Sequence, residues 1–162
     1  MLEILEKTKP FHWASDFWFV FFDENLESKE KDKQGFDAVI GNPPYVNIYS
    51  ISQNKEFVKF YQNFFITAQK KFDLYVLFAE LSINLLKKGG FHSFIVPDKW
   101  MFVPYGYRLR ELFLKIKLEE IRDLTSIKVF EDPVVKNVIY IVRNSGKNKT
   151  IPLGFRFLVC FL

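Results

Sequence analysis

Apolar residues along this chain form short continuous runs in some segments and recur at helical spacing in others. The run FDAVI at 36–40 is short, apolar and bounded by glycines, which predicts a buried strand. The segment 57–65 carries aromatic residues at intervals of three and four, which predicts an amphipathic helix. The next apolar stretch, LYVLFAELSINLLKK at 74–88, predicts a second helix.

Cap and turn residues mark the ends of this second helix. Asp73 precedes it and is suited to cap its amino end, and Gly89 follows two lysines and is expected to end it. The run FHSFIV at 91–96 then predicts a second strand that closes at Pro97. Two helices therefore separate the first two strands.

The remaining pattern predicts a third helix over about 105–117, followed by strands at 119–124 and 134–144. These last two strands are close enough in sequence to pair as a hairpin. Helices between the earlier strands favour parallel pairing. We therefore expect an α/β fold of about four strands, with a parallel sheet layered with helices and an antiparallel hairpin at its edge.

The two ends of the chain differ from this middle region. Residues 1–35 contain the aromatic segment FHWASDFWFVFF at 11–22, which we expect to be extended, and then a charged loop. Residues 36–144 contain the predicted sheet and helices. Residues 145–162 form an apolar tail that fits no predicted element and is expected to be foreign to the parent domain.

Composition narrows the class of protein without identifying it. The 162 residues have a formal net charge of +4, which is compatible with a nucleic-acid partner, but the basic residues are scattered. Aromatic residues make up 19% of the chain, and they suit a phenylalanine-rich core or, less commonly, platforms on which bases stack.

Cysteine and histidine usage excludes several kinds of site. The single cysteine, Cys160, rules out an internal disulfide and favours a reducing, cytoplasmic location. No apolar run is long enough to span a bilayer, so no membrane association is expected. The two histidines, His12 and His92, lack metal-ligand spacing, and we expect no metal site.

The most specific feature is the sequence NPPY at 42–45, which directly follows the first predicted strand. Pro43 and Pro44 fix the backbone and predict a stiff turn at the carboxyl end of that strand, where α/β sheets bind ligands. The Asn42 side chain and the Pro43 carbonyl offer two hydrogen-bond acceptors, and Tyr45 adds a flat ring. This set suits a planar molecule with an amino group, such as a nucleobase.

Two acceptors aimed at an exocyclic amine would also assist methyl transfer to its nitrogen. They favour a tetrahedral nitrogen with a more available lone pair, and they stabilise the positive charge that develops on it. The proton can leave after the methyl group has moved, so the motif needs no general base. The alternative is a structural Pro-Pro turn beside an ordinary aromatic residue.

The sequence FDAVIGNPPYV at 36–46 closely resembles motif IV of the adenine-specific N6 DNA methyltransferases of restriction–modification systems. The likeness continues through 71–101, which resembles the family's DLY and F helix, GG turn and VP ending. It extends to the VF strand pair at 121–142, and KPFHW at 9–13 is similar to the segment that precedes motif IV. The match covers most of the chain.

The resemblance implies a partial Rossmann-like methyltransferase sheet, with residues 36–144 as the carboxyl-terminal half of the catalytic domain. It implies S-adenosyl-L-methionine as the cofactor and double-stranded DNA as the partner, with the target adenine flipped out of the helix. It also implies that Asn42 and Pro43 accept hydrogen bonds from the adenine N6, that Pro44 keeps the turn rigid and that Tyr45 stacks on the base.

Two phenylalanines acquire candidate roles from the same resemblance. Phe130 aligns with an aromatic residue that contacts the flipped adenine at its edge. Phe78 aligns with one that packs on the adenine of the cofactor, and we assign Asn42 to the cofactor side as well. For both phenylalanines the alternative is a simple core residue.

One family feature is missing from the sequence. The family has a glycine-rich FxGxG turn and an acidic residue that holds the cofactor ribose, and none of the seven glycines here forms a GxG sequence. We therefore interpret the chain as a middle fragment from a truncated or split gene, inactive alone and complemented by a second polypeptide that carries the cofactor half. The alternatives are an inactive remnant, a partner-dependent subunit, or an NPPY methylase of protein glutamine or RNA.

Overall fold

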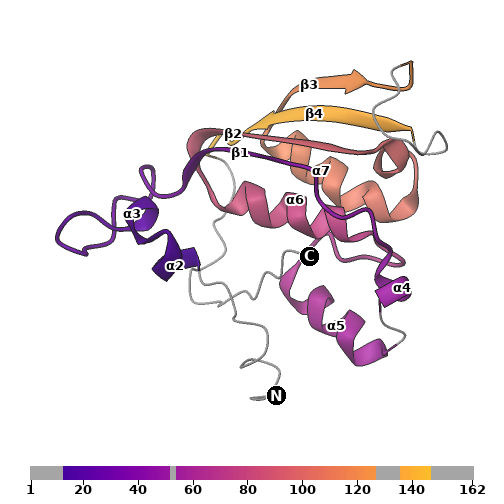
Figure 1. The fold of residues 1–162 in the computed structure, drawn as a ribbon, viewed down its shortest axis with the longest axis horizontal. Helices are drawn as coiled ribbons and strands as arrows, with labels where there is room; N and C mark the ends of the chain where they lie inside the picture. Colours follow the sequence, from indigo (N-terminus) through magenta and orange to yellow (C-terminus); the bar gives the residue numbers. More distant parts are fainter. Residues whose placement is uncertain (1–12, 52–53, 127–135, 147–162) are drawn as a thin grey trace.

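The computed structural model describes residues 13–51, 54–126 and 136–146 of the chain. Four strands in this part of the chain form one sheet with the spatial order β1-β2-β4-β3. The strands are β1 (Phe36–Gly41), β2 (Leu86–Pro97), β3 (Lys117–Asp123) and β4 (Asn137–Arg143). Figure 1 shows the sheet as one curved layer with the larger helices beneath it.

The strand directions follow from the connections between the strands. β1 and β2 are parallel and are separated in sequence by helices, because a parallel pair needs a long crossover. β2 pairs with β4, and β4 with β3, in antiparallel register. The predicted α/β class, with parallel strands and an antiparallel hairpin at the edge, is therefore confirmed.

Six α-helices and two short 3-10 helices complete the described part of the chain. They are α2 (Trp13–Asp16), α3 (Trp18–Phe21), α4 (Ile48–Ile51), α5 (Lys55–Phe64), α6 (Leu74–Asn84), η1 (Asp98–Met101), η2 (Pro104–Gly106) and α7 (Tyr107–Lys115). Within the described residues, no helix has both the length and the apolar character needed to cross a membrane.

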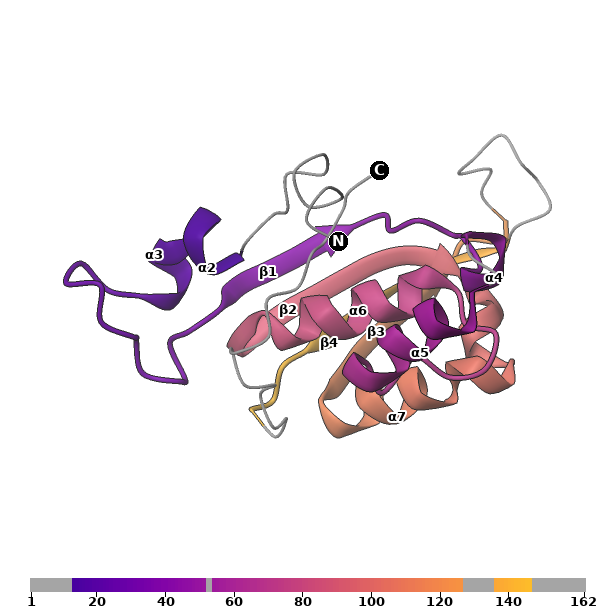
Figure 2. The same cartoon turned by 90° about the horizontal axis from the view of Figure 1, so that it is seen from below.

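The core lies between one face of the sheet and helices α6 and α7 (Figures 1 and 2). Tyr140 of β4 is fully buried, and its ring lies 4.6 Å from that of Phe113 in α7 and 5.8 Å from that of Trp100 in η1. Most residues of α6 are also buried. This explains why its sequence is apolar on nearly all sides rather than amphipathic.

The amino end of β2 differs from the prediction, which continued the preceding helix to Lys88 and ended it at Gly89. In the structure α6 ends at Asn84 and β2 begins at Leu86. The Gly89 N–H donates to the Asn144 carbonyl at 2.7 Å, so this segment is held by contacts with the end of β4. Sheet pairing therefore overrides the helical pattern of the sequence.

A glycine permits the close approach of β1 to this segment. Gly35 has a φ of +108°, and a Cβ atom there would lie 2.5 Å from the backbone nitrogen of Lys87. Directly after it, the Phe36 N–H donates to the Leu85 carbonyl at 2.8 Å. A residue with a side chain at position 35 would be strained and would clash with the start of β2.

The aromatic segment at the amino end forms two short helices where it is described, so the expectation of an extended segment was wrong for residues 13–21. Helices α2 and α3 are each a single turn. The rings of Phe17 and Phe21 contact the ring of Phe36 at 5.3 and 6.3 Å. These edge-to-face contacts attach the segment to the start of β1. Rings on short helical turns can make such contacts as well as rings on an extended segment.

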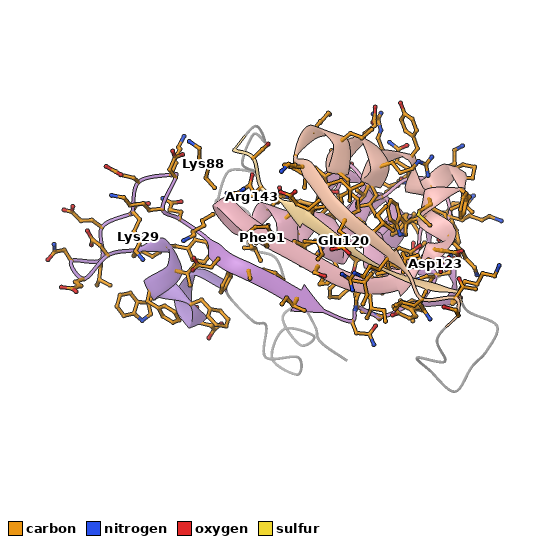
Figure 3. All side chains as sticks on the ribbon, turned by 90° about the horizontal axis from the view of Figure 1, so that it is seen from above. Lys29, Lys88, Phe91, Glu120, Asp123 and Arg143 are labelled. Atoms are coloured by element: carbon orange, nitrogen blue, oxygen red, sulfur yellow. The ribbon has the colours of Figure 1, made fainter. Side chains whose placement is uncertain are left out.

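The second face of the sheet carries no described helix. Phe91 and Glu120 lie on this face in Figure 3, and the Arg143 guanidinium lies 5.4 Å from the centre of the Phe91 ring. Ile40 of the edge strand β1 is 81% exposed. Among the described residues, the sheet is therefore covered by helices on one face and left open on the other.

Candidate functional site

The carboxyl ends of β1 and β2 lie side by side because the two strands are parallel neighbours. Gly41, the last residue of β1, is paired with Phe94 of β2. The NPPY sequence leaves β1 directly after Gly41, and η1 leaves β2 after Pro97. Figure 2 shows both strand arrows ending on the same side of the molecule. The motif thus lies at the sheet edge where α/β folds bind ligands.

The first two residues of the motif have opposite environments. The Asn42 side chain is exposed, whereas Pro43 is buried. No residue in the described part of the chain forms a hydrogen bond with the Asn42 side chain or donates one to the Pro43 carbonyl. Pro43 therefore anchors the turn, and the Asn42 side chain is the predicted acceptor that is exposed to a ligand.

Both the hydroxyl and the ring of Tyr45 make contacts that the sequence did not predict. Its hydroxyl donates to the Ile95 carbonyl of β2 at 2.9 Å, and its ring meets that of Tyr75 edge-on, at 6.4 Å and 85°. Burial raises the pKa of the Tyr45 hydroxyl to about 12, so this hydroxyl remains a donor at neutral pH. The ring is half-buried, and its orientation is set by β2 and α6.

Of the two phenylalanines of the predicted site, only Phe78 lies among the described residues. Phe78 lies one helical turn after Tyr75 in α6, is half-buried and packs against the core. This position is compatible both with packing on the adenine of the cofactor and with a simple core residue, the two interpretations made from the sequence. Phe130 lies outside the described residues. The described structure therefore places Tyr45 against α6, with Asn42 and the prolines on the turn before it, and does not place Phe130.

The described residues meet the needs of S-adenosylmethionine only in part. Phe78 can offer an aromatic face and Asn42 an exposed amide. Gly41 does not supply the missing glycine cradle, because a Cβ atom there would meet the Phe94 ring at 3.1 Å rather than an open space for a ligand. Within the described ranges, the NPPY turn offers hydrogen-bonding groups and a ring, and no GxG sequence accompanies it.

Sequence reasoning missed the polar residues that surround the motif. Asp73 lies at the N-cap position of α6 as predicted, but its side chain makes no capping hydrogen bond. It binds Asn47 and Tyr105 instead. These residues are far apart in the sequence and follow no periodic pattern, so no local signal could have joined them.

A solved structure shares this fold. A Listeria monocytogenes protein assigned as a class I S-adenosylmethionine-dependent methyltransferase matches with a TM-score of 0.53 and 21% sequence identity. The match covers 68% of this chain and 32% of that chain. The described sheet and helices are therefore part of a Rossmann-like methyltransferase fold.

The chain belongs to the Eco57I restriction-modification methylase family, whose family model matches residues 2–130. RM.MjaORFECS2P of Methanocaldococcus jannaschii, assigned as a type II restriction enzyme and methyltransferase, is 34% identical over 96% of this chain and 12% of its own length. The adenine-specific methyltransferase BrxX of Escherichia coli is 28% identical over 77% of this chain and 10% of its own length. The chain thus spans roughly a tenth of these relatives. The resemblance to restriction–modification methylases is confirmed.

Proposed function

We propose that this chain carries the base-binding segment of a DNA adenine N6-methyltransferase of a restriction–modification system. Membership of the methylase family supports methyl transfer, and the relative described as adenine-specific supports adenine as the base. The observation that carries the proposal is the exposed Asn42 side chain on a proline-anchored turn at the end of β1. The partner is double-stranded DNA with the adenine flipped out.

The residues of the turn divide the work of binding and activation. The adenine N6 amine donates hydrogen bonds to the Asn42 side-chain oxygen and to the Pro43 carbonyl. These contacts become stronger as positive charge develops on the nitrogen, so they stabilise the transition state more than the ground state. Because Pro43 is buried and Pro44 has a fixed φ, the backbone of the turn needs little reorganisation during the reaction.

Tyr45 supplies a surface for the flipped base. Its hydroxyl is engaged by Ile95, so the ring presents a face with a fixed orientation instead of acting as an acid or base. S-adenosyl-L-methionine, when bound, would supply the electrophilic methyl group. Phe78 and Asn42 would lie on the cofactor side, and Phe130 would contact the edge of the base.

A second polypeptide, or another part of a longer one, would provide the cofactor loop. Within the described part of the chain, β1 is an edge strand that pairs with β2 alone, and its Ile40 is 81% exposed, which supports this view. On this proposal the chain is inactive alone and active when complemented. A cytoplasmic location stays a prediction.

The test is co-expression of the chain with the polypeptide encoded immediately upstream, or with the cofactor segment of a relative. N6-methyladenine in the host DNA is then measured by mass spectrometry. We expect methylation only in the complemented cells, and Asn42→Ala should lower it by about 10²- to 10³-fold, the usual effect of losing one transition-state hydrogen bond.

Asn63→Ala is the matched control, because Asn63 is an exposed asparagine on α5, outside the NPPY turn. It should retain methylation within about twofold. Transfer of labelled methyl groups to protein or RNA rather than to DNA would overturn the proposal in favour of the alternative substrates. A folded, complemented chain without methylation of any substrate would identify an inactive remnant.

A further inference from the structure

We propose that Asp73 is a positioning residue that holds the NPPY turn in its working orientation through Asn47 and Tyr105. This inference rests on the proposed function, because it assigns the carboxylate a part in the same site. It concerns three segments that meet at the carboxyl edge of the sheet: the turn after β1, the start of α6 and the loop between β2 and α7.

The first connection joins Asp73 to the residue two positions after Tyr45. The Asn47 Nδ2 group donates to Asp73 Oδ1 at 2.9 Å and to the Lys71 carbonyl at 3.1 Å. The Asn47 side-chain oxygen in turn accepts from the Tyr49 N–H at 3.1 Å. The Nδ2 group therefore attaches the end of the turn to the segment before α6, while the side-chain oxygen makes a local contact with Tyr49.

Backbone contacts run beside this side-chain connection. The Leu74 N–H donates to the Val46 carbonyl at 2.8 Å, and the Ile48 N–H donates to the Phe72 carbonyl at 3.1 Å. These two hydrogen bonds flank the Asn47–Asp73 pair on both sides. They offer a direct measure of whether the two segments stay together.

The second connection joins the other oxygen of Asp73 to the loop after β2. The Tyr105 hydroxyl donates to Asp73 Oδ2 at 2.5 Å and lies 2.9 Å from the Tyr75 hydroxyl. Burial and the contact with Asp73 raise the pKa of the Tyr105 hydroxyl, which keeps it a donor. The chain of contacts returns to the motif, because the Tyr75 ring supports the ring of Tyr45.

A carboxylate is the side chain that this arrangement requires. Asp73 accepts from donors on two different segments, one at each oxygen. An asparagine would offer one acceptor instead of two, so the Tyr105 hydroxyl would have to accept from the new N–H group and donate to Tyr75 instead. Because a displacement of about 1 Å at a reacting group can cost about 10²-fold in rate, a small shift of the turn would be visible in catalysis.

The test compares two tyrosine variants with matched chemistry. Tyr105→Phe removes one donor from Asp73, whereas Tyr107→Phe removes a hydroxyl that donates to Glu111 on the exposed side of α7. Asp73→Asn and Asn42→Ala complete the set. Each variant is assayed in the complemented enzyme for kcat and for KM toward DNA, and the 162-residue chain is assayed for amide exchange at Ile48 and Leu74.

We expect Tyr105→Phe and Asp73→Asn to lower kcat by about tenfold or more, with KM for DNA unchanged within about twofold. Exchange at Ile48 and Leu74 should accelerate in both variants, while the midpoint of global unfolding of Tyr105→Phe stays near that of Tyr107→Phe. Tyr107→Phe should match the unmodified chain in every measurement. The split between kcat and KM separates positioning from a general loss of folded protein.

Two results would overturn the inference. If Tyr105→Phe behaves like Tyr107→Phe while Asn42→Ala abolishes methylation, the proposed function stands and the positioning role fails. If amide exchange at Ile48 and Leu74 is unchanged, the role fails whatever the assays of methylation give. If Asp73→Asn does not fold, the kcat and amide exchange of Tyr105→Phe are sufficient to test the positioning role.

Discussion

The two faces of the sheet have the same backbone but different surroundings. On the face that α6 and α7 cover, Phe94 is 5% exposed and Tyr140 is 0% exposed. On the open face, Phe91 is 44% exposed although it lies on the same strand as Phe94. The alternation of side chains along β2 assigns these residues to opposite faces.

This difference separates what holds the fold together from what is available for association. The covered face supplies the apolar burial that stabilises the described domain. The open face carries apolar residues together with Arg143 and Glu120, and β1 has no second strand partner among the described residues. On the proposed function, this face would be covered by the segment that carries the cofactor loop.

Truncation of the two phenylalanines should give the largest contrast. Phe94→Ala removes a buried ring and leaves a cavity, so it should lower the free energy of unfolding by about 3–5 kcal/mol. Phe91→Ala removes a half-exposed ring and should cost less than about 1 kcal/mol. Urea denaturation of both variants measures the difference. Equal losses would show that the open face is packed in solution.

The buried histidine of the covered face should make stability depend on pH. His92 is 0% exposed, its Nε2 atom lies 2.8 Å from the Tyr140 hydroxyl, and burial lowers its pKa from 6.5 to about 3. The folded state therefore binds this proton less readily than the unfolded state. Stability from this group is complete above about pH 6.5 and is lost as pH falls toward 3, by up to about 1.4 kcal/mol per pH unit.

His92→Gln isolates this effect, because glutamine does not titrate. The slope of unfolding free energy between pH 6.5 and 5, above the range in which most carboxylates titrate, should be smaller in the variant than in the unmodified chain. The comparison uses slopes, since the variant can differ in stability at every pH. An identical slope in both proteins would contradict a buried neutral histidine.

Substitution on the edge strand should have the smallest effect on stability. Ile40→Lys places a charge on the open face and should change the free energy of unfolding by no more than about 0.5 kcal/mol, while reducing self-association through the β1 edge. Val39→Lys is the matched control, because Val39 points to the other face and packs against the core. Denaturation and sedimentation measure the two effects, and a large loss in Ile40→Lys would contradict an uncovered face.

Local patterns were sufficient for much of the fold. The spacing of aromatic residues predicted the helix that the structure places at Lys55–Phe64, and the run at 36–40 predicted β1. The prediction that this strand is buried was wrong, because β1 is an edge strand and none of its residues is buried. The pattern failed at Leu86, where the apolar residues of a helix continue into a strand. Helical and strand periodicity cannot be distinguished in a short apolar run, and the pairing of this segment with β1 and β4 decided its conformation.

The candidate site divides in the same way. The chemical character of residues 42–45 was readable from the sequence, because proline geometry and the hydrogen-bonding groups of asparagine are properties of the residues themselves. The structure alone revealed that the Tyr45 hydroxyl binds Ile95 and that Asp73 joins Asn47 to Tyr105. Such contacts depend on segments distant in sequence.

The sequence by itself determined the class of fold, the family and the chemical groups that the turn offers. Each of these follows from the residue types and from their local spacing. Only the tertiary structure decided where α6 ends, which face of the sheet stays open and what orients Tyr45. The physical reason is that these features arise from competition between distant segments for the same hydrogen bonds and buried surface, and no single stretch of sequence contains both competitors.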